Sequence, residues 1–239
     1  MAVAQRRPAT DNRLLKQLPH SVMQSLSADF TSIALPRGTV IAKLGQPVDF
    51  VYFFTDGIGS VIVRTPTGNR AEAGLFGLEG YLPISVIAGI RESQHDMIVQ
   101  VDAEASRLSF DAFSAHLARE PALMNLALRA VEVFTIQLAY TAASNAIHDI
   151  NVRLARWLLM CHDRLVGDEI RLTHDFLSIM LAVRRSSVTT ALHVLEGEGL
   201  IRSSRGSVVI RDRKAMEIYA RDAYGQPEAA FRRLIQNDA

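Results

Sequence analysis

Hydrophobic and polar positions follow three different patterns along the chain. In residues 33–110, short runs of β-branched and aromatic residues alternate with turn residues, as in "TVIAKLGQPVDFVYFFTDGIGSVIVRTPTGN". Short strands separated by Gly, Pro, Asp and Asn predict a small β-sandwich or jelly roll. A short helix over residues 12–28 is expected to precede it.

A long helical segment is predicted next, over residues 111–147. Pro121 suits the first turn of its longer part. Apolar positions recur there at alternating spacings of three and four residues, which is the pattern of two helices packed side by side. We therefore expect a dimer interface along this helix; the alternative is a helix that packs on its own domain. The residues of the expected interface are Leu123, Leu126, Ala130, Val133, Gln137 and Tyr140.

The third pattern starts near residue 149 with an amphipathic helix, "INVRLARWLLMCHDRL". A second helix follows in "RLTHDFLSIML", where Thr173 suits the N-cap and Asp175 the first turn. A third lies in "AVRRSSVTTALHVLEGEGLI" and ends at its glycines. The stretch "LIRSSRGSVVIRD" then predicts a β-hairpin. Helix, helix–turn–helix and hairpin in this order indicate a winged helix–turn–helix.

Removing the apolar positions of the third helix leaves an outer face rich in arginine and hydroxyl groups. In a winged helix–turn–helix this helix enters the DNA major groove. Arginine can bind guanine through two parallel hydrogen bonds, and hydroxyls can bind phosphates or base edges. We expect base or phosphate contacts from Arg184, Arg185, Ser186, Ser187, Thr189, Thr190 and His193. Further phosphate contacts are expected from Thr173, Ser204 and Arg205.

Charge and composition sharpen this expectation. The net charge is only +1, but residues 184–213 hold six arginines against three acidic residues, which suits a polyanionic partner. A solvated surface is the alternative. The single cysteine excludes an intramolecular disulfide and an all-cysteine iron–sulfur cluster or zinc ribbon. No apolar run approaches the ~20 residues of a membrane-spanning helix, and the N-terminus lacks a secretory pattern, so a cytoplasmic protein without membrane contact is expected.

The segment "RLTHDFLSIMLAVRRSSVTTALHVLEGEGLIRSSRGSVVIRD" resembles the DNA-binding domain of the Crp/Fnr family of bacterial transcription regulators. The segment "LPRGTVIAKLGQPVDFVYFFTDGIGSVIV" matches the family's spaced glycines more weakly. The resemblance implies an α+β fold in three parts. A cyclic-nucleotide-binding-like β jelly roll would span residues 1–110, a dimerisation helix and hinge residues 111–148, and the winged helix–turn–helix residues 149–239. It further implies a homodimer on pseudo-palindromic double-stranded DNA and RNA polymerase as a partner.

Four positions depart from the family pattern. Ser186 stands where members commonly have Glu, and Thr190 where they have Arg, so the operator should differ from the family's best-known half-sites. Ala182 replaces the glycine of the turn, at a cost of up to ~1 kcal/mol if it needs a positive φ. Arg184 replaces a capping serine.

The effector expected from the resemblance is not a cyclic nucleotide. Members that bind one hold its phosphate with a Gly-Glu motif and an Arg-Ser pair. Here Leu78 separates Gly77 from Glu79, and the later segment Ser93-Gln94-His95 has no arginine at the expected position. A divergent phosphate pocket, another ligand and a filled, ligand-free core remain alternatives. The candidate pocket residues are Gly77, Glu79, Gly80, Leu82, Arg91 and Gln94.

An enzyme is not expected, and neither is a cofactor or a metal ion. The remote alternative, a cupin-like metal-binding enzyme, needs two or three histidines and a glutamate from neighbouring strands. Among residues 33–110 the only histidine is His95. No Ser/His/Asp set or phosphate-binding loop appears in the sequence either.

Overall fold

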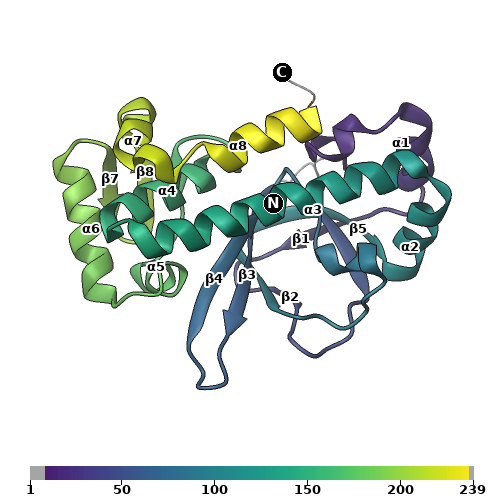
Figure 1. Ribbon diagram of the computed structural model, residues 1–239, viewed down its shortest axis with the longest axis horizontal. Coiled ribbons are helices and arrows are strands. Elements are labelled where there is room, and N and C mark those ends of the chain that lie inside the picture. The colour runs from purple at the N-terminus through teal and green to yellow at the C-terminus, as the bar shows by residue number, and fades with distance from the viewer. Residues whose placement is uncertain (1–8, 237–239) are drawn as a thin grey trace, which may run out of the picture.

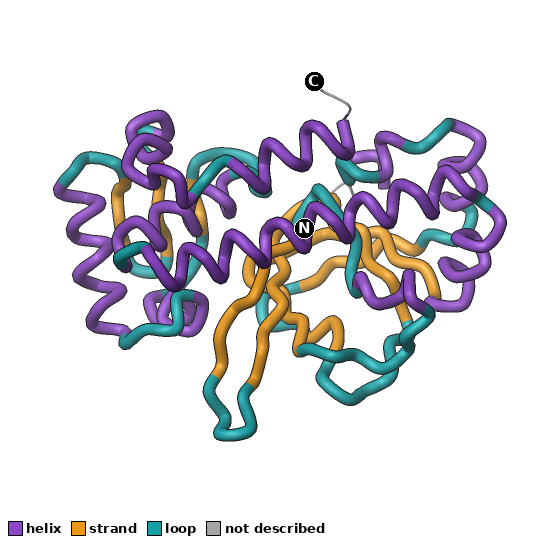
Figure 2. Tube along the Cα trace, viewed as in Figure 1, coloured by secondary structure: helices purple, strands orange, loops and turns teal. Residues whose placement is uncertain are grey.

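The computed structural model describes residues 9–236, which form two lobes bridged by one long helix (Figure 1). We call residues 9–119 the N-terminal lobe, residues 150–225 the C-terminal lobe, and residues 226–236 the C-terminal arm. Figure 2 shows that most strands lie in the N-terminal lobe and that helices dominate the C-terminal lobe. The predicted α+β fold, with a sheet-rich N-terminal domain and a C-terminal helix–turn–helix, is confirmed.

The N-terminal lobe is built on a five-stranded antiparallel sheet. In it β1 pairs with β5, β5 with β3 and β3 with β4, while β2 pairs with β5. A bulge interrupts the β3–β5 register at Gly57, whose φ is +82°. A Cβ there would lie 2.5 Å from Ala103, so the bulge requires glycine. The strands are β1 (Thr31–Leu35), β2 (Val40–Ala42), β3 (Phe50–Arg64), β4 (Arg70–Phe76) and β5 (Asp96–Ser109).

Aromatic side chains fill the interior of this lobe. Phe53 packs edge-on against Phe30 and Phe113, and Tyr81 lies beside both Phe53 and Phe113. The Tyr81 hydroxyl donates a 3.4 Å hydrogen bond to the Ala127 carbonyl, which satisfies the polar end of an otherwise apolar side chain. The lobe also contains helix α1 (His20–Ser27), the 3₁₀ helices η1 (Ala9–Asp11), η2 (Leu15–Gln17) and η3 (Ile84–Ala88), and helix α2 (Phe110–Arg119). The helix predicted over residues 12–28 is thus two shorter pieces, and Pro19 lies between them.

The predicted helix over residues 111–147 is also divided, into α2 and α3 (Pro121–Ile147). Glu120 separates them with an extended backbone, φ −118° and ψ 91°. A residue before proline is driven out of the helical region by the proline ring, and Pro121 then starts the second helix at N1. Of the described helices, α3 has the length and composition to span a membrane, but core helices of soluble proteins pass the same test.

The stripe of α3 expected to form the dimer interface packs within the chain instead. Gln137 bonds the backbone of Leu75 on β4 through both ends of its amide, at 2.7 and 3.2 Å. Phe134, next to this stripe, stacks on Phe76 at a centroid distance of 4.2 Å. This corrects the expected interface, because a stripe that satisfies its own sheet is not free for a second copy. The buried members are Leu123, Leu126, Ala130, Val133 and Gln137, while Tyr140 is half-buried.

The C-terminal lobe follows a hinge at residues 148 and 149. Asp149 caps α4 by accepting hydrogen bonds from the amides of Asn151 and Val152. A three-stranded sheet in the order β6–β8–β7 completes the lobe. Its elements are α4 (Ile150–His162), β6 (Glu169–Ile170), α5 (His174–Met180), α6 (Arg185–Gly197), β7 (Ile201–Ser204), β8 (Ser207–Ile210), α7 (Arg213–Ala220) and the 3₁₀ turn η4 (Arg221–Ala223).

The C-terminal arm leaves its own lobe and lies along α3 (Figure 1). It consists of α8 (Gln226–Phe231) followed by a π-helical turn, Arg232–Gln236. Ile235 is 1% exposed and belongs to the hydrophobic core of the N-terminal lobe, with Phe231 and Leu234 packed against it. The division at residue 149 stays a prediction, to which the structure adds that the last described residues pack with the first lobe.

A buried polar cluster joins the two lobes directly. The Glu72 carboxylate on β4 accepts hydrogen bonds from the Ser60 hydroxyl at 2.5 Å and from the Trp157 indole of α4 at 2.7 Å. Ile58, Ile62 and Leu75 of the sheet share one apolar core with α4, α5 and α6. Burial raises the pKa of Glu72 to about 7, which the two hydrogen bonds and the nearby Arg156 and Arg164 only partly offset.

Candidate nucleic-acid interface

The turn between α5 and α6 has the geometry of a helix–turn–helix. Thr173 caps α5 by accepting a 3.2 Å hydrogen bond from the Phe176 amide, as predicted from the sequence. Ala182 in the turn has a φ of +51°, the left-handed region that favours glycine. A strained alanine therefore lies in the turn directly before α6.

Helix α6 presents one apolar face to the lobe and one polar face to solvent. Val188, Ala191, Leu192 and Leu195 are all 0% exposed, so the face predicted to be buried is buried. Arg184 occupies the N-cap, and its side chain makes no capping hydrogen bond. Because the capping hydrogen bond is missing, Arg184 does not stabilise the start of α6 as a serine would, so helix stability does not explain an arginine at this position.

On the polar face, Arg184, Arg185, Ser186, Thr190 and His193 are exposed. The Thr190 hydroxyl donates to the Ser186 carbonyl at 3.2 Å, so it is held against the helix in the free protein. Arg185 contacts Asp175 of α5 at 3.3 Å through a pair whose side chains are both about two-thirds exposed. Such a solvent-exposed pair is weak, so little free energy is needed to break it.

Two other predicted contact residues on α6 are half-buried, Ser187 and Thr189. The Thr189 hydroxyl lies 3.1 Å from His174 Nδ1 and donates to the Arg185 carbonyl at 3.2 Å. His174 thus contacts the polar face from α5. Sequence reasoning missed it because the signal, a histidine after the N-cap, has meaning only once α5 and α6 are packed together.

The hairpin predicted after α6 is confirmed as β7 and β8, with Arg205 exposed at its tip. Gly206 in the tip has a φ of +82°. Sequence reasoning missed the third strand, β6, which has only two residues and pairs with β8. The Ser207 hydroxyl donates to Glu169 of β6 at 2.8 Å, which ties the hairpin to the lobe.

A groove of about 1300 Å³ brings part of the predicted contact set together. Arg37, Asp56 and Asp102 of the N-terminal lobe form its opposite wall. The remaining predicted residues are not among its lining: Arg184, Ser186, Ser187, Thr189 and Thr190. The predicted contact residues that line it are Thr173, Arg185, His193, Ser204 and Arg205.

The residues predicted to form an effector pocket do not converge. Leu82 is 1% exposed in the aromatic interior, and Gln94 is on the surface, where its amide donates to the Glu92 carbonyl. Arg91 pairs with Asp111 on α2 and lies over the Phe110 ring. The predicted pocket is therefore corrected: aromatic side chains fill the interior of the sheet, so the candidate residues are separated.

Only Gly77, Glu79 and Gly80 of that set lie near a cavity. Glu79 Oε1 lies 2.6 Å from Arg164 Nε, and a Cβ on Gly77 would lie 2.8 Å from the Arg164 side chain. Glu79 and Gly80 line a second cavity between the lobes, which is distinct from the helix–turn–helix groove. The missed partner is Arg164, which lies 85 residues along the chain from Glu79.

Cys161 is buried on α4, and burial raises the pKa of its thiol well above the usual range. Within residues 9–236 no three His, Cys, Asp or Glu side chains converge in a way that could hold a metal ion.

Comparisons with known proteins agree with the helix–turn–helix geometry. Residues 152–219 match the Crp-like helix-turn-helix domain. The chain is 25% identical over 210 residues to a CRP-like cAMP-activated global transcriptional regulator of Mycobacterium tuberculosis, a match that covers 84% of this chain and 93% of that protein.

Solved structures share the fold. A CRP-family transcriptional regulator from Thermus thermophilus superposes with a TM-score of 0.66 and 21% identity, covering 79% of this chain and 96% of that one. The c-di-GMP-responsive global regulator CLP of Xanthomonas campestris superposes with a TM-score of 0.63 and 17% identity, covering 81% of this chain and 100% of that one. The resemblance noted in the sequence is therefore confirmed: residues 152–219 form a Crp-like helix–turn–helix domain, and the chain is similar to Crp/Fnr transcription regulators over most of its length.

Proposed function

We propose that this regulator binds double-stranded DNA by placing the polar face of α6 in the major groove. One observation carries the proposal: the apolar face of α6 formed by Val188, Ala191, Leu192 and Leu195 is fully buried, while arginines and hydroxyls face outward beside the hairpin. We assign the reading of guanine to Arg185 and contact with phosphate to the exposed Arg205 at the hairpin tip. Ser204 and Thr173 are further candidates for phosphate contact.

The operator should differ from those of family members with Glu and Arg on this helix. Ser186 and Thr190 lie one helical turn apart, and both are exposed. A serine hydroxyl is uncharged, so it cannot accept a hydrogen bond from a cytosine amino group as a glutamate carboxylate does. Threonine cannot bind guanine through two parallel hydrogen bonds, as arginine does. The hydroxyls suit several base edges, so discrimination at these two positions should be lower.

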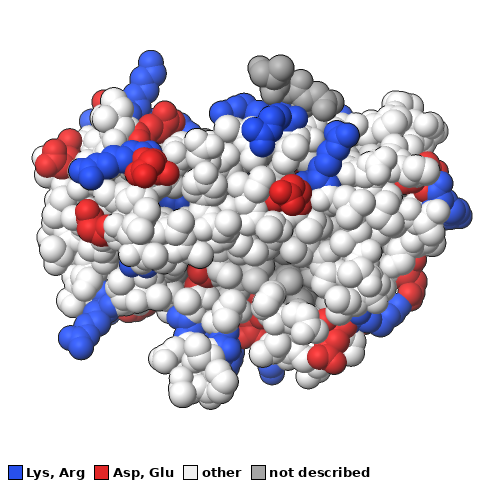
Figure 3. Space-filling model, in the orientation of Figure 1, with Lys and Arg blue, Asp and Glu red and all other residues white. Residues whose placement is uncertain are grey.

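We further propose a homodimer that uses the exposed face of α3. The face left free by the packing within the chain carries a second stripe at spacings of four and three, and all its members are exposed. Its small residues would let two helices approach closely, and Figure 3 shows few charged side chains over α3. The stripe consists of Leu128, Glu132, Thr135, Ala139, Ala142 and Ala146.

Two recognition helices in such a dimer would reach half-sites about 34 Å apart on a pseudo-palindrome. Contact with RNA polymerase and a cytoplasmic location stay expectations of the family resemblance. The effector is proposed not to be a cyclic nucleotide held inside the sheet, because Tyr81 and Leu82 are buried there at 2% and 1% exposure.

The test is selection of bound sequences from a random DNA pool, followed by titration of the selected site. Arg185→Ala should weaken binding to that site by about 1–3 kcal/mol while leaving random DNA less affected. Arg119→Ala, on the surface of α2, is the matched control and should bind normally. Failure to enrich any sequence would refute the proposal. If Arg185→Ala lost equal affinity for the selected site and for random DNA, Arg185 would contact only phosphate.

A further inference from the structure

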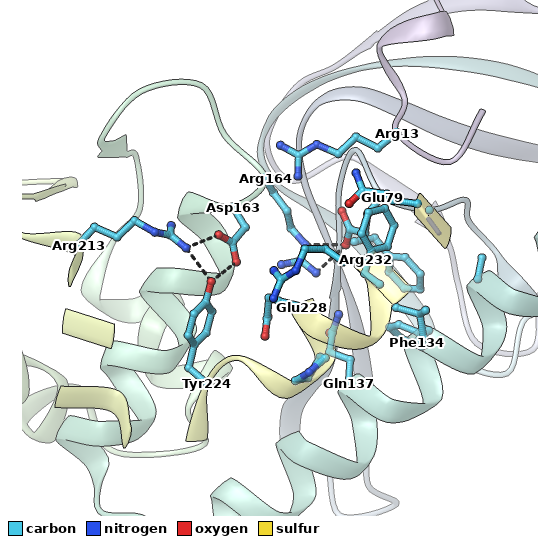
Figure 4. Close-up of a pocket in the computed structure, with 17 residues that line it drawn as sticks. Arg13, Glu79, Phe134, Gln137, Asp163, Arg164, Arg213, Tyr224, Glu228 and Arg232 are labelled. Atoms are coloured by element: carbon cyan, nitrogen blue, oxygen red, sulfur yellow. Dashed lines mark hydrogen bonds and ion pairs between the residues drawn. The ribbon is translucent and has the colours of Figure 1, made fainter. Parts of the chain in front are cut away.

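We propose that the cavity under the C-terminal arm binds a small organic anion with a flat apolar part. The cavity has a volume of about 270 Å³ and lies between the two lobes (Figure 4). Residues from the N-terminal lobe, α3, the C-terminal lobe and the arm line it. It is separate from the sheet interior and from the helix–turn–helix groove.

Two of the acidic groups that line the cavity are neutralised within the chain. Glu79 pairs with Arg164 at 2.6 Å, and this arginine also donates to the Met160 carbonyl. Asp163 accepts hydrogen bonds from Arg213 and from the Tyr224 hydroxyl, each at 2.7 Å. Figure 4 shows these two pairs as separate bonded groups.

The third acidic group, Glu228 on α8, is half-buried. Its carboxylate accepts a hydrogen bond from the Gly225 amide at 3.0 Å, which closes the first turn of the helix. Burial raises the pKa of Glu228 above its ordinary value. Even with Glu228 ionised, the four arginines that line the cavity outnumber its three carboxylates.

Two arginines that line the cavity, Arg13 and Arg232, have no ion-pair partner among the described residues. The backbone of Arg13 is fixed because the neighbouring Asn12 is fully buried and bonds the carbonyls of Phe54 and Gly80. The Arg13 amide also donates to the Leu78 carbonyl at 2.6 Å. A guanidinium without a partner at a cavity is a ready site for a carboxylate or phosphate oxygen.

The wall of the cavity is apolar and partly aromatic. Phe76 and Phe134 stack with an interplanar angle of 25°, and Phe231 and Pro227 of the arm lie along the same cavity. Positive charge at the rim and a flat apolar wall together select an anion that also carries an aromatic or similarly planar group. The volume limits this ligand to a small molecule.

The position of the cavity makes occupancy sensitive to how the lobes are arranged. A ligand there would touch Glu79 on one lobe, Arg164 on the other and Phe231 on the arm. A ligand that binds one arrangement better than another shifts the population toward it. This coupling rests on the proposed DNA binding, whereas the binding site itself does not.

Calorimetry with 1-naphthoate tests the site on the full chain. We expect saturable binding with one site per chain, at least tenfold weaker in Arg13→Gln and in Arg232→Gln, and largely retained in Arg232→Lys. The neutral 1-naphthamide should bind at least tenfold more weakly than the acid, and Arg119→Gln is the control for loss of a surface charge. Thermal melts of each variant separate lost binding from lost folding.

The absence of a saturable heat signal up to about 5 mM naphthoate would overturn the site, because binding weaker than this would not be specific. If wild type bound the amide as tightly as the acid, the role of the arginines would be overturned. The same holds if both glutamine variants bound naphthoate as tightly as wild type. For the coupling, the affinity for the selected operator is measured with and without saturating naphthoate. A shift in wild type that is absent from Arg13→Gln supports the coupling, and an unchanged affinity refutes it. A protein that binds naphthoate but no DNA contradicts the proposed function and leaves the site intact.

Discussion

Replacing Glu72 by Gln should remove a pH dependence that this residue imposes on stability. Glu72 is buried between the lobes, where its carboxylate accepts hydrogen bonds from Ser60 and Trp157. Burial raises its pKa from 4.5 to about 7. The native state therefore holds this proton over a range of pH in which the unfolded chain has lost it.

The direction follows from this difference in proton binding. Below about pH 4.5 the carboxyl group is protonated in both states, and its neutral form is stable at the lobe interface. Between pH 4.5 and 7 only the unfolded state loses the proton, so stability falls as the pH rises. A shift of this size corresponds to a loss of about 3 kcal/mol, complete once the pH exceeds the folded-state value.

The assay is urea unfolding of wild type and Glu72→Gln at pH values from 5 to 8. The glutamine side chain keeps an oxygen that can accept the hydrogen bond from Trp157, and it has no charge. The free energy of unfolding of the variant should therefore rise relative to that of wild type as the pH increases. Glu92→Gln, an exposed carboxylate in the same lobe, is the matched control. Parallel pH profiles for wild type and Glu72→Gln would refute the reasoning.

Three further substitutions test other features. Ala182→Gly should raise the free energy of unfolding by about 0.5–1 kcal/mol by relieving the positive φ, whereas Ala191→Gly in the buried face of α6 should lower it; urea curves in which glycine destabilises both would contradict the strain. Val133→Asp should cost more than about 3 kcal/mol because it buries a charge in the core of one chain, and a calorimetric melt like that of wild type would argue against that placement. Ala139→Asp should convert dimer to monomer without changing the melting temperature, as sedimentation can measure; an unchanged mass would remove the exposed face of α3 from the proposed interface.

Local patterns predicted the C-terminal lobe well. The buried face of α6, the Thr173 cap and the hairpin all follow from spacings of a few residues, over which helix and strand periodicity is informative. The turn at Ala182 was recognised from its position, and its φ confirms that the site favours glycine. The contacts of the polar face with DNA remain predictions.

The errors came from features that depend on distant parts of the chain. Two stripes of α3 share the same alternating spacing, and periodicity alone cannot tell which one packs on the chain's own sheet. The more apolar stripe was assigned to a partner, but β4 and the C-terminal arm cover it. In the same way, Glu79 looked like part of a phosphate motif because its partner, Arg164, is 85 residues away.

The path of the C-terminal arm has a consequence for synthesis on the ribosome. Ile235 completes the core of the lobe whose first described residue is Ala9, so the two ends of the chain meet in one hydrophobic cluster. The N-terminal lobe emerges first and can form its sheet while translation continues. Its core, however, stays open until Ile235 has left the exit tunnel. A ribosome stalled before residue 235 has left the exit tunnel would therefore hold a chain with a complete α6 and an incomplete first lobe.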